Sequence, residues 1–477
     1  MLTRKDLDSD QVHALAFMAS GEDSLICADV GTGKTVLGYT AALDAIAEGS
    51  ATRCIVFAPP LVAADTWAKE PAFWDHIDAA LVAIACGNEK QRTLMVESDA
   101  KIVVMSYENL SWLMEKYPRP RTIRGVREPE TLPFDMLICD EIDKLKSVSS
   151  KRFKNFRDRI GCFKKRIGMT GTLIPNELTE VWGQAYVVDG GASFGRSFYE
   201  WRKAHFYPTD YKQYNWKPFP STRDFLLDQL ESIAFRLEAK GLPEVVTCKP
   251  AKLILPPEIR EQYNELENEF FLILEDLKGK KREVDAANSA VLVGKLQQIC
   301  AGFSYVDRSK DSVWHTHAKF DWLDALHGSL VGNYGEQLLI FYHFNEERAE
   351  LQRRYPHMQF LGGGISKAKK LKSISAWNAG DIPELALHPA SAGHGLNLQH
   401  SGAHNIAFLT VPWSGGMFKQ VCGRLARRGQ TAEYINVHTA QFTDTIDEDV
   451  FGKVTGRLEG MQDFLNDLYD RTTAKAA

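Results

Sequence analysis

Hydrophobic residues in the first part of the chain gather in short runs separated by longer stretches of mixed polarity. The runs occupy residues 25–27, 54–57, 81–84, 102–105, 136–139 and 167–169. Continuous apolar runs of this length are typical of strands buried on both faces, and the stretches between them are long enough for helices. The pattern predicts an α/β lobe in which helices cover both faces of a parallel sheet.

A second series of apolar runs follows at residues 338–341, 360–361, 385–387, 406–409 and 434–437. It predicts a second α/β lobe of the same kind. We therefore expect three regions: a first lobe over residues 1–190, an insert and linker over 191–250, and a second lobe with helical additions over 251–477.

Residues 194–224, within the expected insert, are dense in aromatic and basic side chains. One interpretation is a nucleic-acid platform, on which rings stack with bases and cations meet phosphates. The alternative is a subdomain with a small aromatic core. No single helical or strand period places all the rings on one face, which favours the aromatic core.

Composition narrows the class of protein. The 477 residues include 62 acidic and 57 basic ones, so the chain is not basic overall. Any surface that binds nucleic acid therefore has to be confined to one part of the molecule. Eight cysteines show no zinc-binding spacing, which favours reduced thiols in a cytoplasmic protein. The N-terminus has no apolar signal-peptide core and no apolar stretch reaches membrane-spanning length, so we expect no membrane association.

Residues 28–35 read Ala-Asp-Val-Gly-Thr-Gly-Lys-Thr, directly after the first apolar run. In the loop Gly31-Thr32-Gly33, the glycines let backbone N–H groups approach phosphate oxygens, and the following helix adds its positive N-terminal dipole. Lys34 is expected to reach the β- and γ-phosphates, and Thr35 to place its hydroxyl on Mg²⁺. The phosphate-loop pattern G-x-x-x-x-G-K-[ST] is matched except at its first position, Ala28.

The apolar run 136–139 ends in Asp140-Glu141. Asp140 is expected to hold the metal through water, and Glu141 to orient and deprotonate the attacking water. Either motif alone can arise by chance, but the two together in this order predict hydrolysis of ATP with Mg²⁺.

Arg424 and Arg427 lie near the C-terminus, in the expected second lobe. Three residues apart on a helix, both guanidinium groups can point one way, toward a γ-phosphate. Because only the first lobe has a phosphate loop, we expect the nucleotide to lie in the cleft between the lobes, so that hydrolysis depends on closure. The alternative is a basic surface helix.

Residues 144–166 carry ten Lys or Arg residues against one acidic residue, Asp158. Phe153, Phe156, Ile160 and Phe163 recur at helical spacing, which predicts a helix with one buried face and one cationic face. The cationic face fits either contact with nucleic acid or ordinary solvation.

In order, these segments resemble the motifs of superfamily 2 helicase-like ATPases, specifically the Swi/Snf family of double-stranded DNA translocases in a compact form found in bacteriophages. Gln11 resembles the adenine-reading glutamine, and ADVGTGKT, VFAPPLVAADTWAKE, CDEIDKLKS and MTGTLIPNELTEVWG are similar to motifs I, Ia, II and III. LLIFYHFNEE, HPASAGHGLNLQ and QVCGRLARRGQ resemble motifs IV, V and VI. Asp143 stands where motif II usually has His.

The resemblance implies two RecA-like lobes and a DNA-dependent ATPase that moves along duplex DNA without sequence specificity. It implies that Gln11 and Gly395 bind nucleotide, and that Arg424 and Arg427 are the paired motif VI arginines, with Arg427 as the finger. Host-cell cytoplasm is the expected location of a phage-encoded form. A nuclease or a replication or recombination protein is a candidate partner.

Two alternatives to the translocase remain open at this stage. A strand-separating helicase shares the motifs, although no dedicated wedge hairpin is recognisable. A DNA-binding scaffold switched by nucleotide is a different class, and the intact Lys34, Thr35, Glu141 and Arg427 argue against it.

Overall fold

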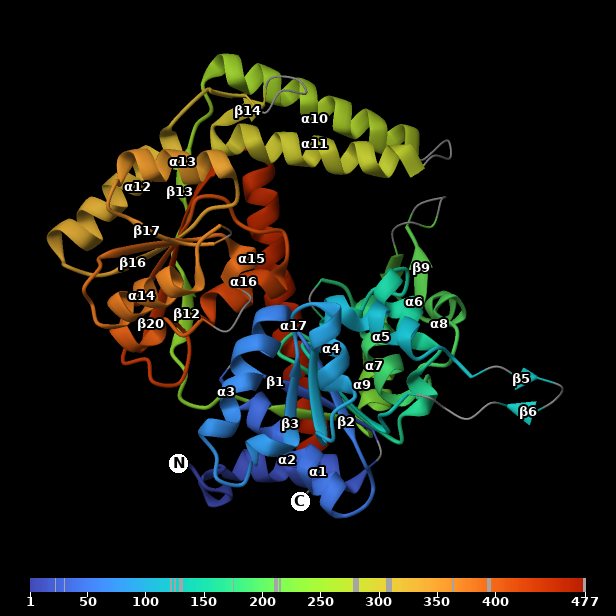
Figure 1. Cartoon of the computed structure of the whole chain (residues 1–477). Helices are drawn as coiled ribbons and strands as arrows, with labels where there is room; N and C mark the ends of the chain where they lie inside the picture. The colour runs from blue at the N-terminus through green and yellow to red at the C-terminus, as the bar shows by residue number, and fades with distance from the viewer. Residues whose placement is uncertain are drawn as a thin grey trace. The chain divides into compact units, whose positions relative to one another are not determined.

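The computed structural model describes residues 1–474, apart from residues 22, 30, 121, 124–125, 128–131, 175, 210–212, 214–215, 278–282, 306–310, 363 and 393–395. The chain forms two compact units (Figure 1). Unit 1 comprises Met1–Tyr207, Pro218–Lys240 and Glu459–Ala477, and unit 2 comprises Pro208–Lys217 and Gly241–Leu458. Most of the segment between residues 191 and 240 is thereby grouped with the N-terminal unit.

Unit 1 is built on a parallel sheet in the order β11-β1-β8-β7-β2-β4-β3. Its strands are β1 (Asp23–Ala28), β2 (Cys54–Ala58), β3 (Val82–Ala85), β4 (Ile102–Ser106), β7 (Met136–Asp140), β8 (Lys165–Thr170) and β11 (Ala234–Leu237). Each of the six apolar runs in the first series forms one strand, as predicted. Strand β11 was not predicted.

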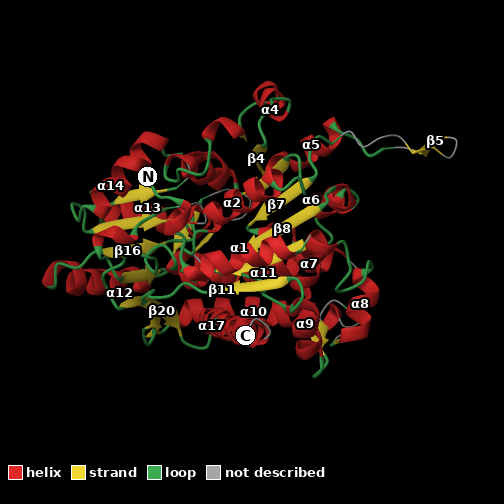
Figure 2. Cartoon of the chain, turned by 90° about the horizontal axis from the view of Figure 1, so that it is seen from below, coloured by secondary structure: helices red, strands yellow, loops and turns green. Residues whose placement is uncertain are grey.

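Helices cover both faces of this sheet (Figure 2). The helices of unit 1 are α1 (Ser9–Ser20), α2 (Lys34–Ala47), α3 (Trp67–Lys69), α4 (Glu89–Val96), α5 (Leu110–Lys116), α6 (Lys151–Arg157), α7 (Val181–Asp189), α8 (Phe198–His205) and α9 (Thr222–Leu230). On one face, Ile26, Val56 and Ile138 pack with residues of α1 and α2. On the other, Phe57 packs against Tyr107 and Phe156. Burial of both faces explains why these strands read as unbroken apolar runs.

Unit 2 has its own parallel sheet in the order β12-β20-β19-β16-β18-β17, with β13 also paired to β20. The strands are β12 (Glu244–Thr247), β13 (Ala251–Leu253), β16 (Leu338–Phe341), β17 (Gln359–Leu361), β18 (Glu384–Leu387), β19 (Asn405–Phe408) and β20 (Tyr434–Phe442). The five predicted runs all form strands. The short, partly exposed β12 and β13 lack an apolar run and were missed.

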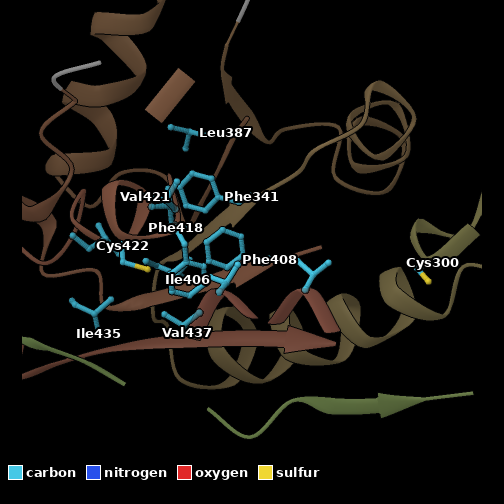
Figure 3. Packing of buried hydrophobic residues seen from close by; sticks show 14 of the residues in the cluster. Cys300, Phe341, Leu387, Ile406, Phe408, Phe418, Val421, Cys422, Ile435 and Val437 are labelled. Carbon is cyan, nitrogen blue, oxygen red and sulfur yellow. The ribbon is translucent and has the colours of Figure 1, made fainter. Parts of the chain in front are cut away.

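The helices of unit 2 pack around two clusters of buried aliphatic and aromatic residues, one that includes Phe341 and Phe408 and one that includes Phe320 and Ile340. The helices are α10 (Pro257–Leu277), α11 (Glu283–Ala301), α12 (Ala318–His327), α13 (Asn345–Arg354), α14 (Lys367–Asn378), α15 (Pro389–Ala392) and α16 (Gly415–Cys422). Figure 3 shows Phe418 of α16 among strand residues of the core, where it stacks on Phe408, which in turn stacks on Phe341. Such offset aromatic stacks add to the stabilisation from burial.

Three small elements lie outside the two large sheets. Antiparallel pairs are formed by β5 (Thr122–Ile123) with β6 (Val126–Arg127), by β9 (Phe206–Pro208) with β10 (Trp216–Pro218), and by β14 (Phe303–Tyr305) with β15 (Ser312–Trp314). The last helix, α17 (Ile446–Ala474), begins in unit 2 and ends in unit 1. Among the described residues, no helix has the length and apolar character needed to span a membrane.

Candidate nucleotide-binding site

Three consecutive strands of unit 1 end in the polar segments that the sequence singles out. The phosphate loop follows β1, Thr170 ends β8 and is followed by Gly171-Thr172, and Asp140 ends β7 and is followed by Glu141. The register places Cys27 beside Thr170 and Met169 beside Asp140. Because all three strands are parallel, these segments meet at the carboxyl edge of the sheet, where open α/β folds bind ligands.

The phosphate loop has the backbone shape that an anion site requires. Gly31 and Gly33 have φ angles of 85° and 81°, a region that glycine adopts without steric cost. Helix α2 begins at Lys34, and within the described part of the chain no side chain caps its N-terminus. The first backbone N–H groups of α2 therefore remain available to phosphate oxygens, supported by the helix dipole.

Gln11 lies against this loop. Its Nε2 donates to the carbonyl of Thr32 over 2.9 Å, and its Oε1 accepts from the backbone N–H of Asp8. A Cβ at position 33 would lie 2.5 Å from Nε2, so a side chain there would displace the Gln11 amide as well as strain the backbone at its φ of 81°. The structure thus brings together Gln11 and the loop, although assignment of an adenine contact to Gln11 stays a prediction.

Lys34 is held among polar groups at the same edge. Its Nζ donates to the carbonyl oxygens of Ala28 and Asp29 over 3.1 and 3.5 Å, and lies 3.9 Å from Oε1 of Glu141. A Cβ at Gly171 would lie 3.6 Å from this Nζ. The lysine therefore stands between the phosphate loop, the Asp-Glu pair and the turn after β8.

Asp140 is buried, and its two carboxylate oxygens differ. Oδ2 accepts a hydrogen bond of 2.8 Å from the indole Nε1–H of Trp67. Oδ1 is buried and accepts no hydrogen bond from any residue in the described part of the chain. Burial, followed by the neighbouring charge of Glu141, raises the pKa of Asp140 to about 6.

These residues fit a magnesium ion. An orphaned carboxylate oxygen is the hard ligand that Mg²⁺ prefers, and the Thr35 hydroxyl at the start of α2 is the second candidate ligand. Bound there, Mg²⁺ would neutralise phosphate charge. Glu141, with a left-handed φ of 53°, is a partly exposed carboxylate suited to act as the base toward water.

Trp67 lies in the segment that resembles motif Ia, and its contact with Asp140 was not predicted. It is fully buried, its ring packs on Tyr39, and Tyr39 Oη donates to its backbone carbonyl. A Cβ at Gly38 would lie 2.6 Å from the indole, so this glycine makes room for the ring. The indole N–H is therefore fixed in its direction toward Asp140.

The segment after Asp140-Glu141 is joined to the segment after β8 by a lysine. Lys146 Nζ lies 2.8 Å from Oε1 of Glu180, and Glu180 also accepts from the backbone and side-chain nitrogens of Asn176. Asp143, at the position where motif II usually has His, is buried, and burial raises its pKa to about 7. An ion pair between Lys146 and Glu180 thus links the two motifs.

In unit 2, Arg424 and Arg427 do not share a helix. Helix α16 ends at Cys422, and both arginines lie in the turns that follow, so the helical prediction for them was wrong. The two side chains nevertheless converge, because Nη1 of each donates to the carbonyl of Leu396, and Arg427 also donates to Asn397 Oδ1 over 2.6 Å. Gly395 lies outside the described residues.

Comparison with protein families decides the assignment. A family model described as the SNF2-related domain matches residues 10–302 of this chain. The chain belongs to the SNF2-related domain family. It is accordingly a DNA-dependent ATPase of superfamily 2, and the Swi/Snf resemblance of the motifs is confirmed.

Individual relatives of this SNF2-related protein come from phage, bacteria and animals. Putative protein p41 of Acyrthosiphon pisum secondary endosymbiont phage 1 is 28% identical over 461 residues, covering 93% of this chain and 94% of the relative. The putative ATP-dependent helicase/translocase YwqA of Bacillus subtilis is 24% identical, covering 76% of this chain but only 38% of YwqA.

Among solved structures, the Sulfolobus solfataricus SWI2/SNF2 ATPase core in complex with dsDNA covers 98% of this SNF2-related chain at 19% identity. This match covers 94% of that chain and has a TM-score of 0.42.

The basic segment of this SNF2-related protein is less cationic at the surface than its sequence indicates. Helix α6 covers only Lys151–Arg157, and Lys165 and Arg166 belong to β8. Lys165 is buried and donates to the carbonyls of Met18 and Gly21, while Arg166 pairs with Asp23. The four apolar residues are buried as expected, and the exposed cations are Lys144, Lys151, Lys154, Arg157 and Lys164.

The aromatic residues after α7 pack mainly against one another. Trp201 of α8 is buried and contacts Phe194 and Phe206. Tyr207 and Phe219 form an exposed pair with ring centroids 5.4 Å apart. The described rings therefore favour an aromatic core over a continuous stacking platform. Tyr211, Lys212 and Tyr214 lie outside the described residues.

Proposed function

We propose that this SNF2-related ATPase hydrolyses ATP with Mg²⁺ to move along double-stranded DNA without sequence specificity. The observation that carries the proposal is the convergence at one sheet edge of the phosphate loop, Lys34 and the Asp140-Glu141 pair, within a chain of this family. Similarity to YwqA, which is described as a putative ATP-dependent helicase/translocase, supports movement on nucleic acid.

Each residue then has a chemical role in the proposed reaction. Lys34 and the N–H groups at the start of α2 bind the phosphates, Asp140 and Thr35 hold the metal, and Glu141 takes the proton of the attacking water. Arg424 and Arg427 stabilise charge on the phosphoryl group in the transition state, and Gln11 and Gly395 contribute to nucleotide binding. The exposed cations Lys151, Lys154 and Arg157 are candidates for phosphate contacts with DNA.

The proposal is tested by measuring ATPase activity with duplex DNA, single-stranded DNA and RNA in parallel. Duplex DNA is expected to stimulate turnover most, and the stimulation should weaken as salt rises because phosphate contacts release counterions. Stimulation by single-stranded RNA but not by DNA would overturn it.

A strand-separating helicase is the second candidate, because the description of YwqA names a helicase as well as a translocase. Displacement of a third strand from a blunt triplex reports translocation, whereas strand release from a tailed duplex reports unwinding. We expect triplex displacement without strand release. Nucleotide binding without phosphate release would instead indicate a switched scaffold.

A further inference from the structure

A buried arginine outside every sequence motif lies beside the phosphate loop. Arg236 belongs to β11, the edge strand next to β1, and only 1% of its side chain is exposed. Arginine is almost never fully buried unless its charge is paired. Its hydrogen-bonded carboxylate partner is Asp29, the residue that follows β1 and precedes the glycines of the loop, and Oε1 of Glu238 lies 3.7 Å from Nε of Arg236.

Arg236 and Asp29 form a bidentate pair, in which two guanidinium nitrogens each contact one carboxylate oxygen. Arg236 Nη2 lies 2.8 Å from Oδ2 of Asp29 and Nη1 lies 3.2 Å from Oδ1, while Nη1 also donates to the carbonyl of Cys27. The backbone N–H of Asp29 donates to the carbonyl of Leu237, the next residue of β11. Strand β11 therefore holds both the side chain and the main chain of Asp29. Bidentate pairs of this kind fix direction as well as distance.

Asp29 transmits this restraint to the loop through its own carbonyl oxygen. That oxygen accepts 2.8 Å and 3.5 Å hydrogen bonds from Thr32 Oγ1 and Lys34 Nζ. Thr32 in turn receives the Gln11 hydrogen bond on its backbone carbonyl. Arg236 is thus connected through one residue to the turn of the loop and to the lysine expected to meet the phosphates.

We propose that Arg236 is a positioning residue for nucleotide binding, acting through Asp29 to hold the phosphate loop in its phosphate-accepting shape. The inference rests on the proposed function, because it assumes that residues 28–35 bind a nucleoside phosphate. It adds a residue more than 200 positions beyond the loop, at the end of the segment through which the chain leaves unit 1 at Lys240.

The same strand offers a matched control. Asp23, at the opposite end of β1, pairs with Arg166 of the other neighbouring strand, β8, with Nε to Oδ1 at 2.7 Å and Nη2 to Oδ2 at 2.8 Å. The two carboxylates are similarly exposed, at 20% for Asp23 and 18% for Asp29. Arg166→Gln therefore breaks a comparable pair far from the loop.

The test is equilibrium binding of a fluorescent ADP analogue to the full chain, with thermal unfolding measured in parallel. Arg236→Gln is expected to raise the Kd about tenfold, the effect typical of lost outer-shell support. Arg166→Gln should lower the unfolding temperature but leave the Kd within about twofold, in line with loss of a structural pair. Arg236→Lys keeps the positive charge but cannot form the two parallel hydrogen bonds to Asp29, so its Kd for the ADP analogue should also be raised.

A second variant keeps the test decisive if Arg236→Gln does not fold. Asp29→Asn preserves size while breaking the pair, and it should raise the Kd to the same extent. The double variant Asp29→Asn with Arg236→Gln should lose little more affinity than either single variant, because both substitutions break the same Arg236–Asp29 pair. The inference would be overturned if the folded Arg236 and Asp29 variants had an unchanged Kd, or if Arg166→Gln lost as much affinity as Arg236→Gln. Absence of ATP hydrolysis by the wild-type chain would count against the proposed function instead.

Discussion

At the scale of single residues, Asp140 and Glu141, the two carboxylates expected to take part in ATP hydrolysis, lie in different environments. Asp140 is buried and fixed by the Trp67 indole, whereas Glu141 is partly exposed and faces Lys34. A buried, oriented carboxylate suits a metal, and a more accessible one suits exchange of a proton with water. Adjacent residues of one strand end can thus take separate roles.

Replacement of Glu141 by Gln should separate binding from turnover. The amide has the size of the carboxylate but cannot accept the proton of the attacking water, so ATP hydrolysis should fall by at least about a hundredfold while ATP still binds. Lys34→Ala should instead weaken binding itself, since a direct phosphate contact is lost. Phosphate release and nucleotide titration on both variants check this, and undiminished hydrolysis by Glu141→Gln would refute the assignment.

Replacement of Trp67 by Phe should impair the metal site. Phe keeps an aromatic ring in the pocket but removes the N–H donor to Asp140, so the Mg²⁺ concentration for half-maximal ATPase activity should rise about tenfold. The control is Tyr39→Phe, which removes the hydroxyl bonded to the Trp67 carbonyl and should cost only about 1 kcal/mol of stability. Equal magnesium dependence in the two variants would contradict the role of Trp67.

At the scale of elements, one helix of unit 2 shows how carboxylates tie a helix to the ends of neighbouring strands. In unit 2, Glu347 of α13 accepts from the backbone N–H groups of His343 and Phe344, which follow β16, and from the hydroxyl of Thr410, which follows β19. One turn later, Glu350 is nearly buried and pairs with Arg353 and Arg354. Helix α13 is therefore anchored by two carboxylates.

Glu350 predicts a specific dependence of stability on pH. Hydrogen bonds from Arg353, opposed by burial and assisted by Arg354, lower the pKa of Glu350 from 4.5 to about 2. Because the folded pKa lies below the unfolded one, the stabilisation is complete above pH 4.5 and is lost as pH falls toward 2. Glu350→Gln should cost about 1–3 kcal/mol at pH 7, after discounting for the exposed Arg353.

Urea unfolding of the Glu350→Gln variant and wild type at several pH values checks this expectation. The difference in midpoint should be constant between pH 7 and pH 5 and shrink below pH 4.5. Glu261→Gln, which changes an exposed carboxylate of α10, is the control and should show little difference. A difference that grows on acidification would contradict the assigned pKa direction.

At the scale of the whole molecule, the nucleotide motifs and the paired arginines belong to different compact units. Unit 1 contains the phosphate loop and the Asp-Glu pair, and unit 2 contains Arg424 and Arg427. The turnover that we propose therefore depends on residues from both units, a dependence that would make hydrolysis sensitive to rearrangement of the chain.

Arg427→Ala should lower ATP turnover roughly a thousandfold, the effect of losing an arginine finger, with little change in ADP affinity. The control is Arg428→Ala, at an adjacent exposed position, which should retain turnover. Single-turnover kinetics in saturating duplex DNA make the comparison. Equal losses in the two variants would indicate a general effect of charge at this turn rather than a finger.

The sequence by itself determined the eleven predicted strands and the identity of the nucleotide motifs. Buried parallel strands need unbroken apolar runs, and a phosphate loop needs glycine and lysine at fixed spacing, so both leave local signals. In the two large sheets, β11 was missed because the charged Arg236 interrupts its apolar residues, and β12 and β13 were missed because they are partly exposed. The helix over Arg424 and Arg427 was wrong because spacing alone does not show where a helix ends.

Only the tertiary structure decided which distant side chains support the site. Trp67 and Asp140 are 73 positions apart, and Arg236 and Asp29 are 207 apart. Parallel strand order brings each pair together, and one sequence contains no periodic signal for a contact between nonadjacent segments. Likewise, ten cations in sequence became fewer at the surface because Lys165 and Arg166 lie in a strand and are satisfied internally. Neighbouring residues in the sequence identify the chemistry of the site. The strand order decides which distant side chains orient these residues.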